Sequence, residues 1–358
     1  MKKTLAISNE SILKMECWTY YKMSIIQTLP QYMNWLSAHM NIYFAELGEG
    51  IYFGEGIKPH RAEYYSDILH IEEIDLYQVI PCEIIDRIKS SINDDYYFVV
   101  FLRDEKGYSH EVFIYGFDDE SKMFESLMLR DDGIFVSTSI SFLKLEADYR
   151  NNYTYYKNNP ENYYEKSDYG YVMYRMKPNL KYINKNYAVE FFGKLYHEVY
   201  GTRTDLCYSD DYDEFLTPCS FYTGVTCLIR LVDKINELMD NREWDEKNTE
   251  QYILKKNLFK LLEHRKLIYD SMIWYEHQWR IDAEHIVSLH NEYHTCCENM
   301  NKICMVYLKY LYTKNESLLT RIKDMIIKQY RDERRILCEY VNVIREFYMS
   351  KVLPKRFD

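Results

Sequence analysis

The stretch that decides the fold is Gly107-Tyr-Ser-His110-Glu-Val-Phe-Ile-Tyr-Gly116-Phe-Asp-Asp119. Between His110 and Gly116 the residues are mostly β-branched or aromatic, and two aspartates follow soon after the glycine. This composition predicts a strand that runs into a tight turn. Because side chains alternate across a strand, we expect His110 to share a face with Val112 and Ile114, at the rim of a buried sheet.

Strand-like patterns lie on both sides of this stretch and are separated by turn residues. The sequence before residue 107 also predicts a helix that begins with Pro81, because proline is favoured at the first helical turn. The predicted elements are strands at 73–79, 96–102, 110–116, 123–129 and 134–140, a helix at 81–92, and a short helix from 141. An antiparallel meander of this kind, with a helix before it, indicates an α+β fold.

The second half of the chain follows a different pattern. Residues 151–166 are rich in Asn, Tyr and Lys and predict a connecting loop, after which 171–176 form one further strand. From about residue 187 onwards we expect only helices, because apolar residues recur at spacings of three and four, and these helices should form a bundle. The sequence therefore predicts two domains, residues 1–176 and residues 177–358.

Charge and composition exclude several classes of protein. The net charge of -11 disfavours nucleic acid as the main partner, because phosphate binding requires a clustered basic surface. No stretch is apolar for long enough to span a membrane, and polar residues interrupt any signal-peptide pattern. The nine cysteines include no CxxC pair. We therefore expect a reduced, cytoplasmic protein with no membrane association.

One cysteine lies where a thiol would be activated. Trp18, Tyr21 and Ile25 have helical spacing, and Pro30 ends the predicted helix, so Cys17 lies at the N-terminus of that helix. There the helix dipole and the unpaired backbone N–H groups favour a thiolate and lower the pKa of the thiol. Cys17 is thus a candidate nucleophile and His110 a candidate base, and such a pair needs a third group to fix the imidazole tautomer.

Cys17 at a helix start, followed 93 residues later by the run His-x-Val-x-Ile-Tyr-Gly-x-Asp-Asp, resembles papain-like cysteine enzymes. The most similar branch is the one related to bacteriocin-leader peptidases, and within it the butirosin-H-type N-terminal domains of thiotemplated biosynthesis. The resemblance implies a papain-like catalytic core followed by an α-helical bundle. It also implies transfer of an acyl group from a carrier-protein thioester, through a thioester on Cys17, to an amine.

The partners implied by this resemblance are an acyl or peptidyl carrier protein and a small amine acceptor. The carrier protein would bring its own phosphopantetheine arm, so the enzyme would need no cofactor and no metal. His290, His294 and Cys297 do share a face of one predicted helix, which makes a metal site geometrically possible. The apolar stripe of that helix and the lack of a HExxH motif favour an ordinary helix core.

The orienting residue is not fixed by the sequence. Folding the hairpin about residues 119 and 120 places His110 opposite Met128 or Leu129, which cannot accept a hydrogen bond from imidazole. Asp131 is the nearest downstream carboxylate and would reach the imidazole if the strand carries a bulge. We therefore predict Asp131 as the third catalytic residue, with Asp132 as the second choice.

The oxyanion donor also departs from the pattern of the related enzymes. They typically carry a Gln six residues before the nucleophile, where this chain has Ser11. The Cys17 backbone N–H remains available, and Ser11 and Asn9 are the candidates to assist it. A weak oxyanion hole matters less for a thioester than for an amide, which favours a transferase. The alternatives are a cysteine peptidase, in which water resolves the acyl-enzyme, and an inactive homologue that serves as a binding module.

Overall fold

The computed structural model describes residues 1–45, 50–53, 62–129, 135–164, 170–201, 203–208, 217–240, 249–280 and 284–347. The chain forms two compact units, and each of them draws on two separate parts of the sequence. The first unit comprises Met1–Tyr32 and Lys58–Asn184, and the second comprises Met33–Ile57 and Lys185–Asp358.

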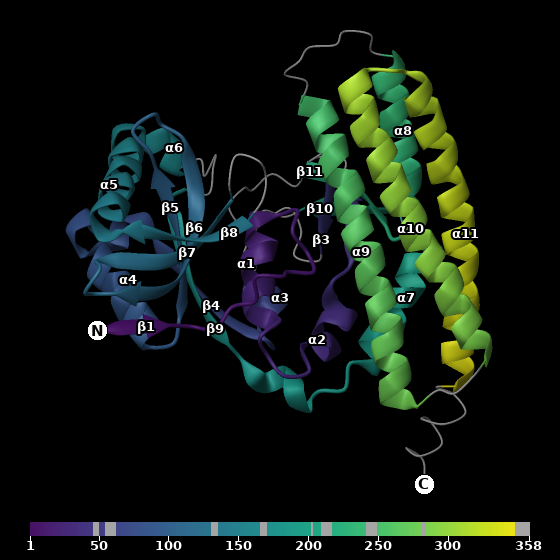
Figure 1. Cartoon of the computed structure of the whole chain (residues 1–358), viewed down its shortest axis with the longest axis horizontal. Coiled ribbons are helices and arrows are strands. Elements are labelled where there is room, and N and C mark those ends of the chain that lie inside the picture. The colour runs from purple at the N-terminus through teal and green to yellow at the C-terminus, as the bar shows by residue number, and fades with distance from the viewer. Residues whose placement is uncertain are drawn as a thin grey trace. The chain divides into compact units, whose positions relative to one another are not determined.

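The first unit is built on an antiparallel sheet of seven strands, six of which follow the order β4-β9-β5-β6-β7-β8 (Figure 1). The short strand β1 pairs with the last residues of β6, next to the part of β6 that pairs with β5. The strands are β1 (Lys2–Thr4), β4 (Leu69–Asp75), β5 (Tyr97–Arg103), β6 (Ser109–Asp118), β7 (Met123–Leu129), β8 (Phe135–Ser141) and β9 (Val172–Pro178). The stretch quoted first thus forms β6, near the middle of the sheet.

Helices cover the first sheet on both faces. Val112 and Ile114 of β6 belong to a core that includes residues of α4 and α5, as the alternation predicts. Phe113 points the other way and stacks on Tyr21 of α1, with ring centroids 5.2 Å apart. The helices of this unit are α1 (Cys17–Ile26), α3 (Ala62–Tyr65), α4 (Ile84–Asn93), α5 (Phe142–Asn158) and α6 (Pro160–Tyr164), with 3₁₀ turns at Leu76–Gln78, Pro81–Glu83 and Leu180–Asn184.

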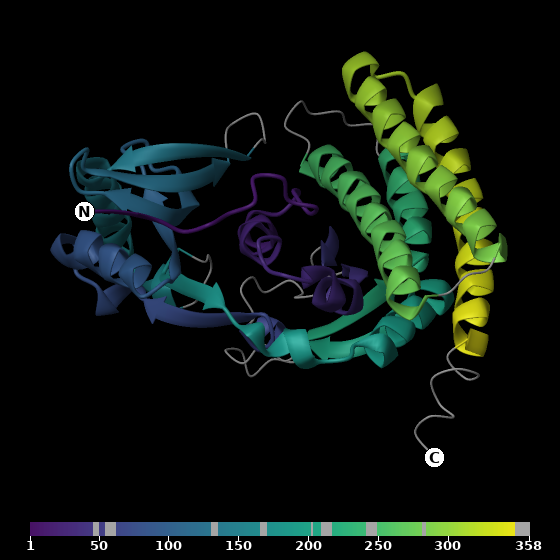
Figure 2. The ribbon, with the colours of Figure 1, turned by 60° about the horizontal axis from the view of Figure 1, so that its bottom comes forward.

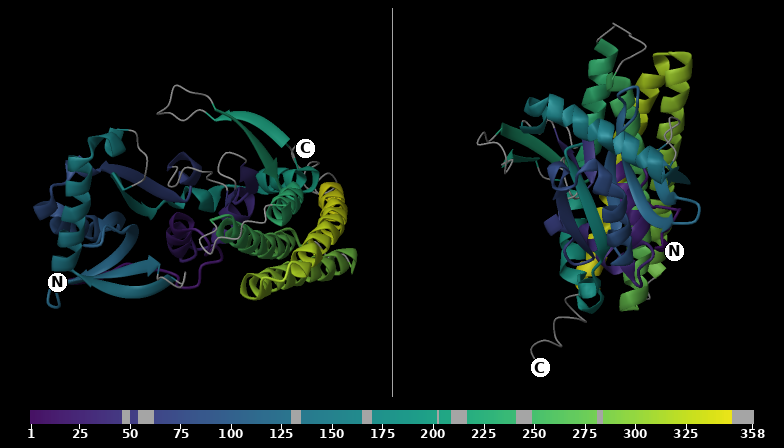
Figure 3. Two further views of the ribbon diagram at one scale, coloured as in Figure 1. Left: turned by 90° about the horizontal axis from the view of Figure 1, so that it is seen from above. Right: turned by 90° about the vertical axis from the view of Figure 1, so that its left-hand side faces the viewer.

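The second unit combines a four-stranded sheet, in the order β10-β11-β2-β3, with six helices. The strands are β2 (Ile42–Ala45), β3 (Gly50–Phe53), β10 (Arg203–Tyr208) and β11 (Thr217–Thr223), of which the last two form the hairpin seen in the left view of Figure 3. The helices are α2 (Tyr32–His39), α7 (Ala188–Tyr200), α8 (Thr226–Asp240), α9 (Thr249–Trp279), α10 (Glu284–Thr313) and α11 (Ser317–Phe347). Helices α9, α10 and α11 run alongside one another as a bundle (Figure 2).

The α+β class and the C-terminal helical bundle are confirmed, but two local predictions are wrong. Residues 151–164 are not a loop, because α5 continues to Asn158 and α6 follows it; residues 165 and 166 lie outside the described residues. Tyr149 and Tyr156 bury one face of α5, so tyrosines supply the apolar stripe that the composition concealed. The prediction of helices alone after residue 187 fails at β10 and β11, and β11 pairs with β2, a partner far upstream in the sequence.

A third prediction is displaced along the chain. The strand expected at 73–79 begins at Leu69 and ends at Asp75. The Asp75 carboxylate accepts a hydrogen bond from the Tyr77 N–H at 2.8 Å and so caps a 3₁₀ turn, which ends the strand. The predicted domains 1–176 and 177–358 also differ from the two units at two segments, because residues 33–57 join the later part of the chain and residues 177–184 belong to the first unit. Among the helices of the described residues, none is long and apolar enough to cross a membrane.

Candidate active site

Cys17 occupies the first position of α1, as predicted, and its thiol is half-buried. The first turn of α1 contains no acidic residue. The segment before the helix is tied back to its last turn: the Ile12 N–H donates to Gln27 Oε1 at 3.0 Å, and Gln27 Nε2 donates to the Glu10 carbonyl at 3.1 Å. The helix start is thereby held in place, with its dipole directed at the sulfur.

His110 is positioned by the tight turn between β5 and β6. Asp104 Oδ1 accepts hydrogen bonds from the N–H groups of Lys106 and Tyr108, each at 2.9 Å. Gly107 has φ +84°, a left-handed conformation that glycine adopts without a steric penalty. Beyond this turn β6 begins, and His110 pairs with Leu102 of β5.

The helix and the strand bring the two predicted residues together. Cys17 Sγ lies 3.6 Å from His110 Nε2. On the other side of the ring, His110 Nδ1 lies 2.8 Å from the backbone carbonyl oxygen of Glu111. A carbonyl oxygen can only accept, so Nδ1 carries the hydrogen, and the lone pair of Nε2 faces the thiol. This is the tautomer that a general base needs in order to take a proton from sulfur.

Among the described residues, the group that orients the His110 ring is therefore the backbone carbonyl of Glu111. The carboxylates predicted for this role, Asp131 and Asp132, lie outside the described residues. The hairpin turns about residues 120 and 121, not 119 and 120, because Asp118 pairs with Met123. The register of β6 against β7 shifts between Ile114 and Gly116. Every residue has a carbonyl, so no sequence pattern points to the one of Glu111.

The oxyanion candidates Ser11 and Asn9 lie in the segment before α1. The Ser11 hydroxyl donates to the Leu13 carbonyl at 2.7 Å and is buried, so it would have to leave this contact to serve an oxyanion. The side-chain oxygen of Asn9 accepts from Ser137 Oγ at 2.8 Å. The third candidate donor is the Cys17 backbone N–H, at the first position of α1 and adjacent to the sulfur.

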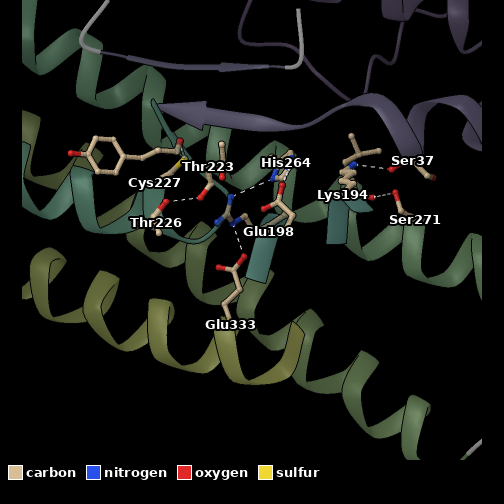
Figure 4. A network of polar contacts seen from close by, with 12 residues as sticks. Ser37, Lys194, Glu198, Thr223, Thr226, Cys227, His264, Ser271 and Glu333 are labelled. Carbon is tan, nitrogen blue, oxygen red and sulfur yellow. Dashed lines mark hydrogen bonds and ion pairs between the residues drawn. The ribbon is translucent and has the colours of Figure 1, made fainter. Parts of the chain in front are cut away.

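A second group of polar residues, in the other unit, was not found from the sequence. Lys194, Glu198, His264, Arg265 and Glu333 come from α7, α9 and α11, and each is at most 3 % exposed. Figure 4 shows Glu198, His264 and Glu333 close to one another, and Arg265 contacts both Glu333 and His264. The sequence indicates this buried polar group only weakly, in that charged residues interrupt the apolar stripes of the helices.

The contacts of Arg265 affect the pKa values of its neighbours in this group of polar residues. Arg265 Nε pairs with Glu333 Oε1 at 2.8 Å, and Arg265 NH1 lies 3.3 Å from His264 Nδ1. Burial, with the positive charges of Arg265 and Lys194, lowers the pKa of His264 well below 6.5. On the other side of the ring, His264 Nε2 lies 3.2 Å from Glu198 Oε1. Burial also raises the pKa of Glu198, although Arg265 and Lys194 oppose this.

Within the described residues, no group of three or more His, Cys, Asp or Glu side chains is arranged to hold a metal ion. Two of the three residues considered for metal binding, His290 and Cys297, have other surroundings. His290 pairs with Glu276 of α9, and burial raises the pKa of the Cys297 thiol to about 12.

No protein-family model matches this chain, and the comparison with curated proteins finds no match either. The case for a function therefore rests on the geometry around Cys17 and His110.

Proposed function

We propose that the protein is a cysteine acyltransferase that forms an amide bond by way of a thioester on Cys17. The observation that carries the proposal is the alignment of Cys17 Sγ, His110 Nε2 and, behind the ring, the Glu111 carbonyl. A nucleophile at the start of a helix that faces a histidine on an antiparallel strand is also the arrangement of a papain-like core. The reducing, cytoplasmic setting expected from the cysteine pattern would keep Cys17 as a thiol.

The first half of the reaction loads the acyl group onto the enzyme. His110 Nε2 takes the Cys17 proton, and the thiolate attacks the carbonyl carbon of the donor thioester. The Cys17 N–H stabilises the oxyanion that forms. When the tetrahedral intermediate collapses, the carbon–sulfur bond of the donor breaks, and the imidazolium returns its proton to the leaving thiol. The donor would be an acyl or peptidyl carrier protein with its own phosphopantetheine arm.

In the second half, a small amine attacks the Cys17 thioester. His110 Nε2 takes one proton from the attacking nitrogen and passes it to Cys17 Sγ as the enzyme carbon–sulfur bond breaks. The products are an amide and the regenerated thiol. No redox step occurs, and the protons balance without a cofactor.

The alternative of a cysteine peptidase uses the same acyl-enzyme but starts from an amide and ends with water. An amide nitrogen leaves far less readily than a thiolate, so a peptidase needs stronger oxyanion stabilisation. The Ser11 hydroxyl, which stands where related enzymes carry a Gln side chain, donates to the Leu13 carbonyl. This weakly furnished oxyanion site favours an activated thioester as the donor.

The test is intact-protein mass spectrometry after incubation with an acyl pantetheine thioester. We expect the wild type to gain the mass of the acyl group, and Cys17→Ala to gain none. His110→Ala should be acylated at least 100-fold more slowly, because a general base contributes about 10²–10⁴ to such steps. Cys338→Ala serves as a matched control, since Cys338 is also a half-buried cysteine but lies on α11.

The fate of the adduct separates the candidate functions. Faster discharge with added diamine than in water, with the amide recovered as product, supports the transferase. Discharge at the same rate in water supports a hydrolase. An adduct that survives Cys17→Ala, or no adduct from any thioester, would show that the protein does not act through Cys17 and would favour the binding module.

A further inference from the structure

We propose that Tyr21 is a positioning residue of the Cys17–His110 pair, whose hydroxyl holds the Glu111 carbonyl that in turn orients the imidazole. The inference rests on the proposed function for the roles of Cys17 and His110. It does not depend on which acyl donor the enzyme takes.

Two donors converge on one backbone oxygen. The Tyr21 hydroxyl lies 3.1 Å from the Glu111 carbonyl oxygen, and His110 Nδ1 lies 2.8 Å from the same atom. A carbonyl oxygen has two lone pairs, so it accepts both hydrogen bonds at once. The Tyr21 hydroxyl fixes the direction in which this carbonyl points, and hence the line along which the Nδ1–H bond is held.

The same helix carries the nucleophile and this hydroxyl. Cys17 and Tyr21 are four residues apart in α1, which places them on one face, one turn from each other. Cys17 meets the imidazole at Nε2, while Tyr21 meets the acceptor of Nδ1. A shift of α1 relative to β6 would therefore disturb both ends of the ring together, so α1 and β6 set the geometry of the pair as one rigid unit.

The Tyr21 ring is itself held firmly. It is completely buried, stacks on Phe113 at an interplanar angle of 8°, and meets Phe135 edge-on. Burial, followed by the nearby charges of Glu111 and Cys17, raises the pKa of Tyr21 well above 10. The hydroxyl thus keeps its hydrogen at physiological pH, including when Cys17 is a thiolate.

Tyr97 offers a matched control for the experiment. Its ring is also buried and stacked on Phe113, with centroids 5.5 Å apart, and its hydroxyl also donates to a backbone carbonyl. That carbonyl belongs to Ala6 and has no contact with His110 among those described. Tyr21→Phe and Tyr97→Phe therefore remove the same group from similar surroundings, and only the first touches the proposed chain of contacts.

The first readout is the tautomer of His110. In protein with ¹⁵N-labelled histidine, the ring nitrogens of His110 are assigned from the signals that His110→Gln removes. At a pH where the ring is neutral, we expect the wild type and Tyr97→Phe to show a protonated Nδ1. In Tyr21→Phe both nitrogen shifts should move toward the average of the two tautomers. A purely structural role for Tyr21 would not change this ratio.

The second readout is the rate at which iodoacetamide alkylates Cys17, measured on the Cys17 peptide by mass spectrometry. We expect Tyr21→Phe to lower this rate about tenfold, the factor that corresponds to one hydrogen bond of ordinary net strength. Thermal unfolding of both variants shows whether they fold alike. Equal tautomer ratios and equal alkylation rates in Tyr21→Phe and Tyr97→Phe would overturn the proposal.

Neither readout uses an acyl donor. If no thioester acylates the wild type, the proposed function fails, while these two measurements still decide the role of Tyr21. If acylation succeeds but Tyr21→Phe behaves like Tyr97→Phe, only the role of Tyr21 is rejected.

Discussion

Among single residues, those with a fully buried charge have the largest effect on the stability of the fold. Arg265 and Glu333 are both 0 % exposed and lie on different helices, α9 and α11. Transfer of two such charges from water is costly, and only their mutual contact and further hydrogen bonds offset this cost. Tyr293 of α10 supplies one of these bonds, since its hydroxyl lies 3.3 Å from Glu333 Oε1. The ion pair thus joins three helices of the bundle.

Removal of one partner of the Arg265–Glu333 ion pair should therefore destabilise the second unit strongly. We expect Glu333→Gln to destabilise the second unit by about 3–5 kcal/mol, because it leaves the Arg265 charge buried without its main counter-ion. Glu339→Gln on the same helix is the control: Glu339 is 41 % exposed and pairs with Arg335, so its loss should cost less than about 1 kcal/mol. Urea unfolding followed by circular dichroism compares the two. Similar losses for both variants would contradict the structural role given to the buried pair.

At the scale of elements, we expect the pairing of β4 with β9 to depend on pH. Glu72 of β4 lies directly opposite Arg175 of β9. The Glu72 carboxylate accepts from Arg175 Nε at 2.6 Å and from the Tyr96 hydroxyl at 2.9 Å, and it also pairs with His70. Burial alone would raise the pKa of Glu72, but the bonds from Arg175, His70 and Tyr96 outweigh it and lower the pKa to about 2.

The sign of the pH effect follows from this shift. The ordinary pKa of a glutamate is 4.5, so between pH 4.5 and about 2 the unfolded state binds more protons at Glu72 than the folded state. The stabilisation is complete above that window and is lost as the pH falls through it. We expect Glu72→Gln to cost about 1–2 kcal/mol at pH 7, a value reduced for the solvent exposure of the pair.

The difference in the free energy of unfolding between Glu72→Gln and the wild type should shrink toward zero near pH 2. Hydrogen exchange of the β4 and β9 amides over a pH series measures it. Glu120→Gln, in the exposed β6–β7 turn, provides the reference. A constant difference between Glu72→Gln and the wild type at all pH values would show that Glu72 acts through packing and not through its charge.

Elements with a local pattern were predictable, and those that depend on distant partners were not. The strands β5 to β8 follow from β-branched and aromatic runs between turns, and α1 follows from its apolar spacing and Pro30. Cys17 and His110 could be named because a helix start and a strand edge are local features. The Glu111 carbonyl and the pairing of β11 with β2 depend on tertiary contacts that no local pattern reveals.

At the scale of the whole molecule, the two units share an interleaved sequence. Residues 33–57 belong to the second unit, although residues of the first unit both precede and follow them. Buried polar side chains tie this segment to the later helices. Lys194 of α7 donates to the Ser37 carbonyl at 2.9 Å, while Asn257 and Lys260 of α9 bind the backbone N–H and C=O of Ile51. These three side chains are at most 6 % exposed.

A fragment that contains only residues 185–358 should therefore fold poorly. Without residues 33–57, Lys194, Asn257 and Lys260 lose their backbone partners, at a cost of about 1–3 kcal/mol for each buried polar group left unpaired. The fragment also lacks β2, so the edge of β11 that pairs with it becomes exposed and prone to association.

Fusion of residues 33–57 to the fragment through a flexible linker should restore a cooperative thermal transition and a monomeric state in size-exclusion chromatography. The matched control is the same fusion with Asn257→Leu, which keeps the segment but removes the partner of the Ile51 N–H and should lower the midpoint again. A fragment 185–358 that unfolds cooperatively without residues 33–57 would show that the helices form a unit on their own, as the division at residue 176 implies.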